Sequence, residues 1–300
     1  MFNKITIIGL GLIGSSIARA IKKKHLCKNL VAHDKSKIVL KKIVKLKITN
    51  HIEPNLKKSV QDSDLVIICT PLGTYKNIVS IIKNYLKNTC ILTDVGSAKI
   101  FVTNTVNKLI NKNTIWIPAH PVAGTEQSGP EAGFADLFKN RWCIITPINK
   151  KNPTSLKKLN NFWKKIGSKV QHMSPEHHDK VMAITSHIPH LIAYNIVGTA
   201  ANLEKDTKSE VIKYSASGFR DFTRIASSDP TMWRDIALNN RKQILHMLEK
   251  FNSDLSNLKR AIIKKDAGKL FKLFSKTRKI RQAIVKAGQD IDSPNFGRKN

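Results

Sequence analysis

The sequence contains no apolar run long enough to cross a lipid bilayer. A spanning helix needs roughly 18 or more consecutive apolar residues, whereas the apolar start at Ile5 runs into glycines within a few residues. The same start lacks the small-residue cleavage site that ends a secretory signal. We therefore expect a cytoplasmic protein with no membrane partner.

Cysteine is scarce as well. The chain has four cysteines with no CxxC pair among them, namely Cys27, Cys69, Cys90 and Cys143. Scattered single cysteines favour reduced thiols in a reducing compartment over a disulfide framework or a zinc site. We expect no metal.

Acidic residues are too few to balance the basic ones. The chain has 52 Lys and Arg against 21 Asp and Glu, which gives a formal net charge of +31. Such a charge raises the question of nucleic acid. The lysines, however, are spread along the whole chain without aromatic residues between them and without a long basic arm. We interpret them as a solvated surface and expect no nucleic-acid partner.

The first part of the chain has the pattern of an α/β domain. Three hundred residues with 41% hydrophobic content can bury a substantial core, and the length suits two domains. Short apolar runs alternate with amphipathic segments up to about Met173. The expected strands are 5–8, 30–32, 65–69, 90–93, 114–117, 142–146 and 170–172. This alternation predicts βαβ units and a mostly parallel sheet.

The strand signal stops after Ser174, and the rest of the chain has a helical pattern. Ser174 and Asp229 are residues of the helix N-cap type, and each is followed directly by a proline. Apolar residues then recur at helical spacing over 244–262, and Asp266 precedes a final helix. Because long amphipathic helices need a partner surface, we expect these C-terminal helices to form a homodimer.

A glycine-rich loop follows the first expected strand. Gly9, Gly11 and Gly14 form a GxGxxG pattern before a helix. The first glycine allows the tight turn, the second lets the backbone approach a pyrophosphate, and the third lets helix and strand pack closely. Amide groups at the helix N-terminus then meet the phosphates. The loop also contains Leu10, Leu12 and Ile13. It predicts a Rossmann-type dinucleotide-binding domain over residues 1–173, followed by an all-helical domain for dimerisation and substrate binding over residues 174–300.

An acidic residue at the end of the second strand favours NAD over NADP. Asp34 lies twenty residues after Gly14, where its carboxylate can accept hydrogen bonds from the adenosine ribose. It would repel a 2′-phosphate, although Lys35 and Lys37 partly offset that charge. The later strand that ends at Cys69, Thr70 and Pro71 should reach the crevice where the nucleotide crosses the sheet.

Polar clusters follow two more strands. Ser97 lies in the first and His120 in the second, and the carboxyl ends of parallel strands are where such sheets bind ligands. We expect Ser97 and His120 to form a hydrogen-bonded pair near the nicotinamide. In the helical part, Arg220 and Arg224 lie four residues apart, and Asp221 can hold Arg224 from three residues before it.

Five ordered motifs together resemble one enzyme family. They are GLGLIGSSIA, TDVGSAK, HPVAGTEQSGPEAG, TSHIPHLIA and GFRDFTRIASSDPTMWRDI. Over nearly all its length the chain resembles the prephenate/arogenate (cyclohexadienyl) dehydrogenase family. We expect the monofunctional bacterial form, without a chorismate mutase segment before the glycine loop or a regulatory domain after the last helix.

The resemblance implies that the enzyme decarboxylates a small anionic cyclohexadiene oxidatively, with NAD as the cofactor. A hydride leaves the hydroxyl-bearing ring carbon, a base takes the hydroxyl proton, and the ring carboxylate leaves as carbon dioxide. The product is 4-hydroxyphenylpyruvate from prephenate or tyrosine from arogenate. The preferred substrate and feedback by tyrosine both stay open.

The resemblance also implies roles for residues at matching positions. His120 would accept or polarise the hydroxyl proton, for which an imidazole is suited. Ser97 would orient His120 and the nicotinamide, and His187 would position the substrate. Arg224 would bind a substrate carboxylate through its forked guanidinium.

Further residues complete the implied substrate site. Glu126 and Asp221 would hold Arg224 and gate the pocket. Trp233 would help to close the site, either from the same chain or from a partner subunit, and Thr125 would contact the substrate.

Two other functions remain as alternatives. One is a different two-domain dehydrogenase of the β-hydroxyacid or pyrroline-carboxylate type, which shares the glycine loop but should lack the HPVAGTE motif. The other is a basic NAD-sensing protein that binds nucleic acid, which would show a steeply salt-dependent affinity for duplex DNA.

Overall fold

A computed structural model describes residues 2–147, 152–202, 210 and 213–286. The chain divides into two compact units, Met1–Ile244 and Leu245–Asn300, and each is described by itself. The predicted boundary between residues 173 and 174 lies inside the first unit, in the short connection between a strand and a helix, and it stays a prediction. No helix within these described ranges is long and apolar enough to cross a membrane.

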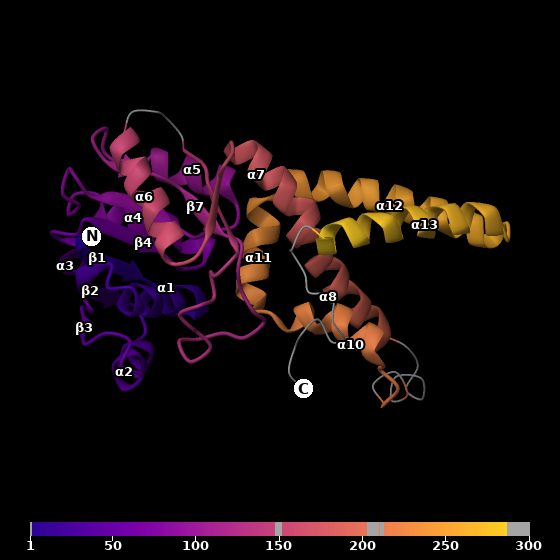
Figure 1. Cartoon of the computed structure of the whole chain (residues 1–300), viewed down its shortest axis with the longest axis horizontal. Coiled ribbons are helices and arrows are strands. Elements are labelled where there is room, and N and C mark those ends of the chain that lie inside the picture. Colours follow the sequence, from indigo (N-terminus) through magenta and orange to yellow (C-terminus); the bar gives the residue numbers. More distant parts are fainter. Residues whose placement is uncertain (1, 148–151, 203–209, 211–212, 287–300) are drawn as a thin grey trace. The chain divides into compact units, whose positions relative to one another are not determined.

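Six strands form a parallel sheet in the first unit (Figure 1). They are β1 (Phe2–Ile8), β2 (Cys27–His33), β3 (His51–Ile52), β4 (Leu65–Ile68), β5 (Ile91–Asp94) and β6 (Ile115–Trp116). Their spatial order is β3-β2-β1-β4-β5-β6, which is the order of the Rossmann fold. Because the order reverses between β1 and β4, the crevice at the carboxyl ends of these two strands is where such a sheet binds its nucleotide.

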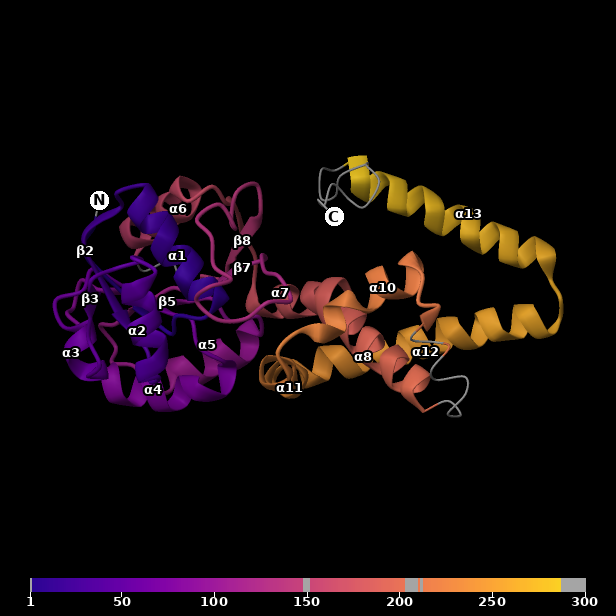
Figure 2. The same cartoon turned by 90° about the horizontal axis from the view of Figure 1, so that it is seen from below.

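Helices cover both faces of this sheet. Figure 2 shows α1 and α6 on one face and α4 and α5 on the other. The helices and short turns that connect the strands are α1 (Leu12–Lys23), α2 (Lys37–Lys45), α3 (Leu56–Val60), η1 (Leu72–Thr74), α4 (Tyr75–Ile82), α5 (Lys99–Asn107) and α6 (Pro153–Lys165). This arrangement confirms the predicted α/β fold with a dinucleotide-binding sheet.

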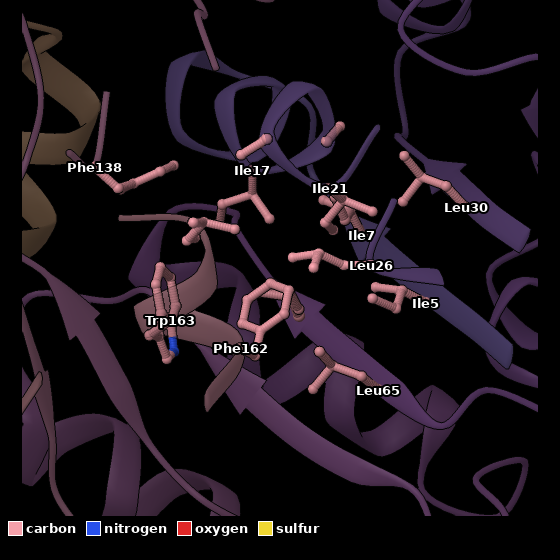
Figure 3. Close-up of a cluster of buried hydrophobic side chains, with 14 of the residues drawn as sticks. Ile5, Ile7, Ile17, Ile21, Leu26, Leu30, Leu65, Phe138, Phe162 and Trp163 are labelled. Carbon is pink, nitrogen blue, oxygen red and sulfur yellow. The ribbon is translucent and has the colours of Figure 1, made fainter. Parts of the chain in front are cut away.

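The alternation of side chains along the strands builds two cores. Successive residues of a strand point to opposite faces, so Ile5 and Ile7 pack with α1 and α6, whereas Ile8 packs with α4 and α5. Figure 3 shows the first core, in which Phe162 and Trp163 of α6 lie against strand residues. The strands are buried on both faces, as parallel strands usually are.

A second sheet of three strands lies at the end of the Rossmann part. It has the order β7-β8-β9, with β7 (Ala119–Pro121) antiparallel to β8 (Trp142–Ile145) and β8 parallel to β9 (Lys169–His172). Strands near 142–146 and 170–172 were predicted, but β7 was not, because only three residues form it. His120 therefore lies within a strand, paired with Ile144, and not in a loop.

The helical part of the first unit begins with the predicted caps. The Ser174 side chain accepts a hydrogen bond from the amide of His177, and Asp229 accepts one from the amide of Met232. The elements are α7 (Pro175–Met182), the π-helical turn η2 (Ala183–His187), α8 (Ile188–Ala201), α10 (Ser217–Thr223), the 3₁₀ turn η3 (Arg224–Ser227), α11 (Pro230–Asn239) and the start of α12 (Arg241–Ile263). Pro189 has no N–H to continue the ladder, which accounts for the widened turn before it.

The second unit contains the rest of α12 and helix α13 (Ala267–Ile284). Asp266, which was expected to precede a final helix, caps α13 by accepting a hydrogen bond from the amide of Lys269. Both helices expose large apolar side chains. Among these, Ile263 is 68% exposed, Phe271 74% and Phe274 55%.

Candidate active site

The glycine loop has the geometry that a dinucleotide requires. Gly9 has a φ of +91° and lies against Thr70, so a side chain is excluded there. A Cβ at Gly14 would lie 2.0 Å from the carbonyl oxygen of Gly9. At Gly11, by contrast, a Cβ would meet no described atom within 4 Å. The backbone is thus tightly packed at Gly9 and Gly14 and open at Gly11, which lies at the N-terminus of α1. This arrangement suits the binding of a pyrophosphate.

Asp34 is held next to this loop at the end of β2. One carboxylate oxygen, Oδ2, accepts a hydrogen bond of 2.9 Å from the amide of Leu10, and Oδ1 accepts one of 2.9 Å from the amide of Ser36. Each oxygen keeps a lone pair for a further donor. The Asp34 carboxylate is thus fixed beside the glycine loop with acceptor capacity to spare, and its predicted role towards the ribose stays a prediction.

The residues after β4 line the same crevice. Cys69 donates its amide to the carbonyl of Ile8 at 2.7 Å, which ties the end of β4 to β1. The Thr70 hydroxyl accepts a hydrogen bond from Thr74 at 2.7 Å, and the Pro71 carbonyl accepts one from the Thr74 amide. The Leu12 and Ile13 side chains pack against the first core. Only the backbone at these two positions is therefore available to phosphates.

A buried ion pair supports the end of β5. Both carboxylate oxygens of Asp94 accept hydrogen bonds from Lys99, at 2.8 and 2.7 Å, and neither side chain is exposed. Asp94 also accepts the Tyr75 hydroxyl at 3.0 Å and the Gly96 amide at 2.8 Å. Lys99 donates a further bond of 2.6 Å to the carbonyl of Ala119. The network fixes β7, and so His120, relative to the loop that carries Ser97.

His120 is linked to a second histidine and an aspartate. Its Nδ1 lies 2.8 Å from Nε2 of His178, and Nδ1 of His178 lies 2.8 Å from Oδ1 of Asp179. The two oxygens of Asp179 also accept the amides of Lys99 and Ile100, at 2.7 and 2.9 Å. Helix α7 is thereby anchored on the N-terminus of α5.

This chain of hydrogen bonds determines the tautomer of His120. Burial raises the pKa of Asp179, but both of its oxygens accept backbone amides, which favours the carboxylate. Since a carboxylate can only accept, His178 carries its proton on Nδ1 and presents a bare Nε2. His120 then donates from Nδ1, which leaves its Nε2 bare as an acceptor. Burial, together with the charge of Lys99, lowers the pKa of His120 well below its usual value and that of His178 to about 2. Both rings are therefore neutral in the resting protein.

Ser97 does not make the predicted hydrogen bond. The hydrogen bonds of the described residues include none between Ser97 and His120, and the His120 ring is bonded through Nδ1 to His178 instead. Ser97 is partly buried in the loop after β5, one residue after Gly96. Its predicted role towards the nicotinamide stays a prediction.

His187 is buried in the π-helical turn, and one of its two ring nitrogens makes no hydrogen bond to a described residue. Its Nδ1 lies 3.1 Å from the side-chain amide nitrogen of Asn240, which also donates to the carbonyl of Asp179 at 2.9 Å. Because that amide nitrogen can only donate, His187 carries its proton on Nε2. Within the described ranges this nitrogen has no partner. Burial lowers the pKa of His187 to about 4, so the ring is a neutral donor.

Glu126 meets Arg224, as the sequence predicts. A guanidinium nitrogen of Arg224, Nη1, donates to a carboxylate oxygen of Glu126, and both side chains are about one-third exposed. The Arg224 Nε has no partner in the described part of the chain. The prediction that Asp221 also holds Arg224 is wrong, because Asp221 pairs with the exposed Arg220 at 3.6 Å. The Arg224 guanidinium is held by Glu126 instead.

Trp233 is buried beside the histidines of the same chain. Its ring stacks on His190 with centroids 3.8 Å apart, and it lies edge-on to His187 at 6.2 Å. Its indole nitrogen is buried with no partner among the described residues. This position supports His187 from within the chain. Thr125 is exposed next to Glu126 and accepts the amide of Gln127 at 3.3 Å.

Sequence reasoning missed His178, Asp179 and Asn240. The first two stand in the run His177-His178-Asp179 at the start of α7. A histidine followed directly by an acid was a usable signal. Nothing in the sequence, however, indicates that α7 packs on α5, or that Asn240 reaches back to His187.

Two family models match the chain. One is described as the nucleotide-binding domain of prephenate dehydrogenase and matches residues 17–172. The other is described as the dimerization domain of prephenate dehydrogenase and matches residues 174–276.

Individual proteins match over most of the chain. A cyclohexadienyl dehydrogenase of Zymomonas mobilis is 38% identical over 97% of this chain and 99% of its own length. A prephenate dehydrogenase of Bacillus subtilis is 33% identical over 95% of this chain and 76% of its own. The crystal structure of prephenate dehydrogenase from A. aeolicus, in complex with hydroxyphenyl propionate and NAD⁺, has a TM-score of 0.86 at 29% identity. That alignment covers 95% of this chain and 99% of the other.

Proposed function

The chain belongs to the prephenate dehydrogenase family, and we propose that it oxidatively decarboxylates prephenate, arogenate or both in tyrosine biosynthesis, with His120 as the base. The observation that carries the assignment of the base is the neutral His120, whose Nδ1 is occupied and whose Nε2 is bare. A neutral imidazole is the side chain best suited to take a hydroxyl proton near neutral pH.

Different residues of the chain carry out different steps of this reaction. NAD held at the glycine loop would supply the acceptor for the hydride that leaves the hydroxyl-bearing ring carbon. His120 takes the hydroxyl proton through Nε2, and loss of the ring carboxylate as carbon dioxide then makes the ring aromatic. The fixed chain of His178 and Asp179 keeps His120 in the orientation that this transfer needs.

Two unfilled donors support a site for an anionic substrate. The Nε2–H of His187 is buried and unpaired within the described ranges, and the Arg224 guanidinium keeps a free Nε beside its bond to Glu126. Buried donors without partners are unfavourable unless a ligand satisfies them. We infer that Arg224 binds a substrate carboxylate and that His187 donates to the substrate, with Trp233 holding His187 in place.

We propose NAD as the preferred dinucleotide. Asp34 presents a fixed carboxylate beside the glycine loop, which can accept from a ribose hydroxyl and repels a 2′-phosphate. The ratio of kcat/KM for NAD over NADP should therefore exceed one. Asp34→Asn should lower that ratio, and a wild-type ratio below one would contradict the proposal.

We also propose a homodimer in a reducing compartment, the cytoplasm. The exposed apolar residues of α12 and α13 support dimerisation, and so does the match of residues 174–276 to a dimerization domain. All four cysteines are free thiols, which suits that compartment. Light scattering should report twice the chain mass of 33.7 kDa, and a monomer at micromolar concentration would count against the dimer.

The role of His120 is tested by His120→Asn. The variant should bind NAD normally, and its kcat should fall by about 10²-fold or more, the usual scale for acid–base catalysis. Near-normal turnover would refute the assignment of the base. The exposed His177 offers a matched control, because His177→Asn should leave kcat unchanged.

A further inference from the structure

The hydrogen-bond chain behind His120 ends inside the protein. From His120 it passes to His178 and then to Asp179, and the last two side chains are at most 1% exposed. In the described part of the chain, the remaining donors to Asp179 are the amides of Lys99 and Ile100 at the start of α5. Since backbone amides do not release protons at neutral pH, a proton that enters this chain from His120 can leave only through His120.

We propose that His178 and Asp179 form a closed proton store, which takes up the substrate hydroxyl proton through His120 and returns it to the product. His178 and Asp179 are thus positioning residues that also share the transferred charge. The proposal rests on the function given above.

The proposed reaction needs such a store because it borrows one proton and gives it back. As the ring carbon is oxidised, the O–H bond breaks and His120 Nε2 gains the proton. The proton on His120 Nδ1 moves to His178 Nε2, and the new imidazolium lies against the Asp179 carboxylate. When the C–C bond to the ring carboxylate breaks, its electron pair makes the ring oxygen a phenolate. That oxygen takes the proton back from His120, whose Nδ1 regains its own from His178.

The charged groups around His120 and His178 suit a pair of rings that is neutral before the substrate gives up its proton. Lys99 is paired with Asp94, so Asp179 is the carboxylate of this buried cluster that faces the neutral His178 ring. Burial raises the pKa of Asp179 and lowers that of Lys99. A proton from the substrate neutralises this cluster. Because burial, and after it the charge of Lys99, lowers the pKa of His178 to about 2, the stored proton is weakly held and returns readily to a phenolate.

The variant His178→Gln separates onward proton transfer from orientation. A glutamine oxygen can still accept from His120 Nδ1 and so keep Nε2 bare, but it cannot carry a proton onward. His177→Gln on the same helix turn is the matched control, because His177 is exposed. The rate of NADH formation in a single turnover is the quantity to compare, since product release does not mask it.

We expect His178→Gln to lower this rate by about 10- to 100-fold, with KM and NAD affinity within about threefold of the wild type, and His177→Gln to change nothing. In mixtures of H₂O and D₂O, a plot of the wild-type rate against the deuterium fraction should be curved, because two protons move in the same step. The dependence should be linear in His178→Gln. A rate for His178→Gln within about threefold of the wild-type rate, or equally curved plots for the two proteins, would refute the proposed proton store.

A pH indicator in weak buffer tests whether the store is closed. On a timescale shorter than the hydration of carbon dioxide, we expect the indicator to show no transient release of a proton as NADH forms. A release of about one proton that follows NADH formation and is taken up again as the phenol forms would show that the chain discharges to solvent and would overturn the proposal.

Asp179→Asn gives a second test if His178→Gln does not fold. An asparagine amide facing His178 reverses both tautomers and leaves His120 protonated on Nε2, a change that costs about 10⁴-fold in the serine-protease triad. Nitrogen NMR of the free wild-type protein should find the proton of both rings on Nδ1, and the opposite tautomers would refute the chain without any turnover. A wild type with these tautomers but no activity towards prephenate or arogenate would instead refute the proposed function.

Discussion

Gly14 and Gly11 belong to one loop, and alanine at the two positions should have opposite effects. A Cβ at Gly14 would lie 2.0 Å from the carbonyl oxygen of Gly9, whereas real Cβ atoms keep at least 3.0 Å. The loop or helix α1 must therefore move by about 1 Å, and the obstacle is backbone, which yields little. Overpacking of this kind costs about 3 kcal/mol at the upper end of its usual range. The better helix propensity of alanine returns about 1 kcal/mol.

Gly14→Ala should thus lose about 2 kcal/mol of the free energy of unfolding, which corresponds to roughly 4–8 °C in Tm for a unit of this size. Gly11→Ala should leave Tm within about 2 °C, because Gly11 has a φ of −70° and open space around it. That space is where we place the pyrophosphate. A methyl group there should raise the Kd for NAD by at least about tenfold, or about 1.4 kcal/mol.

Thermal melts without ligand and NAD titrations by calorimetry measure the two effects separately. Wild-type Tm in Gly14→Ala would refute the packing argument. Wild-type NAD affinity in Gly11→Ala would refute the position of the pyrophosphate.

Three further predictions concern the interior and the substrate site. Lys99→Met should lower the free energy of unfolding by about 3–5 kcal/mol in urea melts, because Asp94 is left buried without its partner. Adding Asp94→Asn to this variant should restore part of the loss. An unchanged urea midpoint in Lys99→Met would contradict the role of the pair. Arg224→Lys should raise KM for the dianionic substrate while leaving the Kd for NAD unchanged, since an ammonium cannot replace a forked guanidinium; an effect on NAD alone would exclude the carboxylate role. Burial lowers the pKa of His187 to about 4, below the value near 6.5 of an unfolded histidine, so the unfolded chain binds the extra proton. The free energy of unfolding should therefore fall as the pH drops from about 6.5 towards 4, and urea melts that differ little between about pH 7.5 and 5 would contradict this.

The Rossmann part of the fold could be predicted because its signals are local. The run from Ile5 to Gly14 joins an apolar strand, a glycine turn and a helix within a few residues, and Asp34 follows at the expected distance. The caps at Ser174 and Asp229 are equally local. Such signals depend on backbone geometry that the residues themselves determine.

The site was less predictable because its contacts join distant parts of the chain. His120 and Ser97 were expected to pair, since both follow strands of the sheet, but His178 from α7 takes that place. Asn240 reaches His187 from 53 positions away. Arg224 was expected to pair with Asp221 three residues before it, but its guanidinium binds Glu126, which lies 98 positions away in the sequence. Packing between helices decides these contacts, and no spacing in the sequence encodes it.

The most direct test of the account is a turnover experiment with the purified chain. NAD is mixed with prephenate or with arogenate, and NADH absorbance and carbon dioxide are followed together. We predict equal amounts of NADH and carbon dioxide, with 4-hydroxyphenylpyruvate or tyrosine as the product, and loss of both signals in His120→Asn. The absence of NADH with both substrates, or NADH without carbon dioxide, would contradict the proposed function.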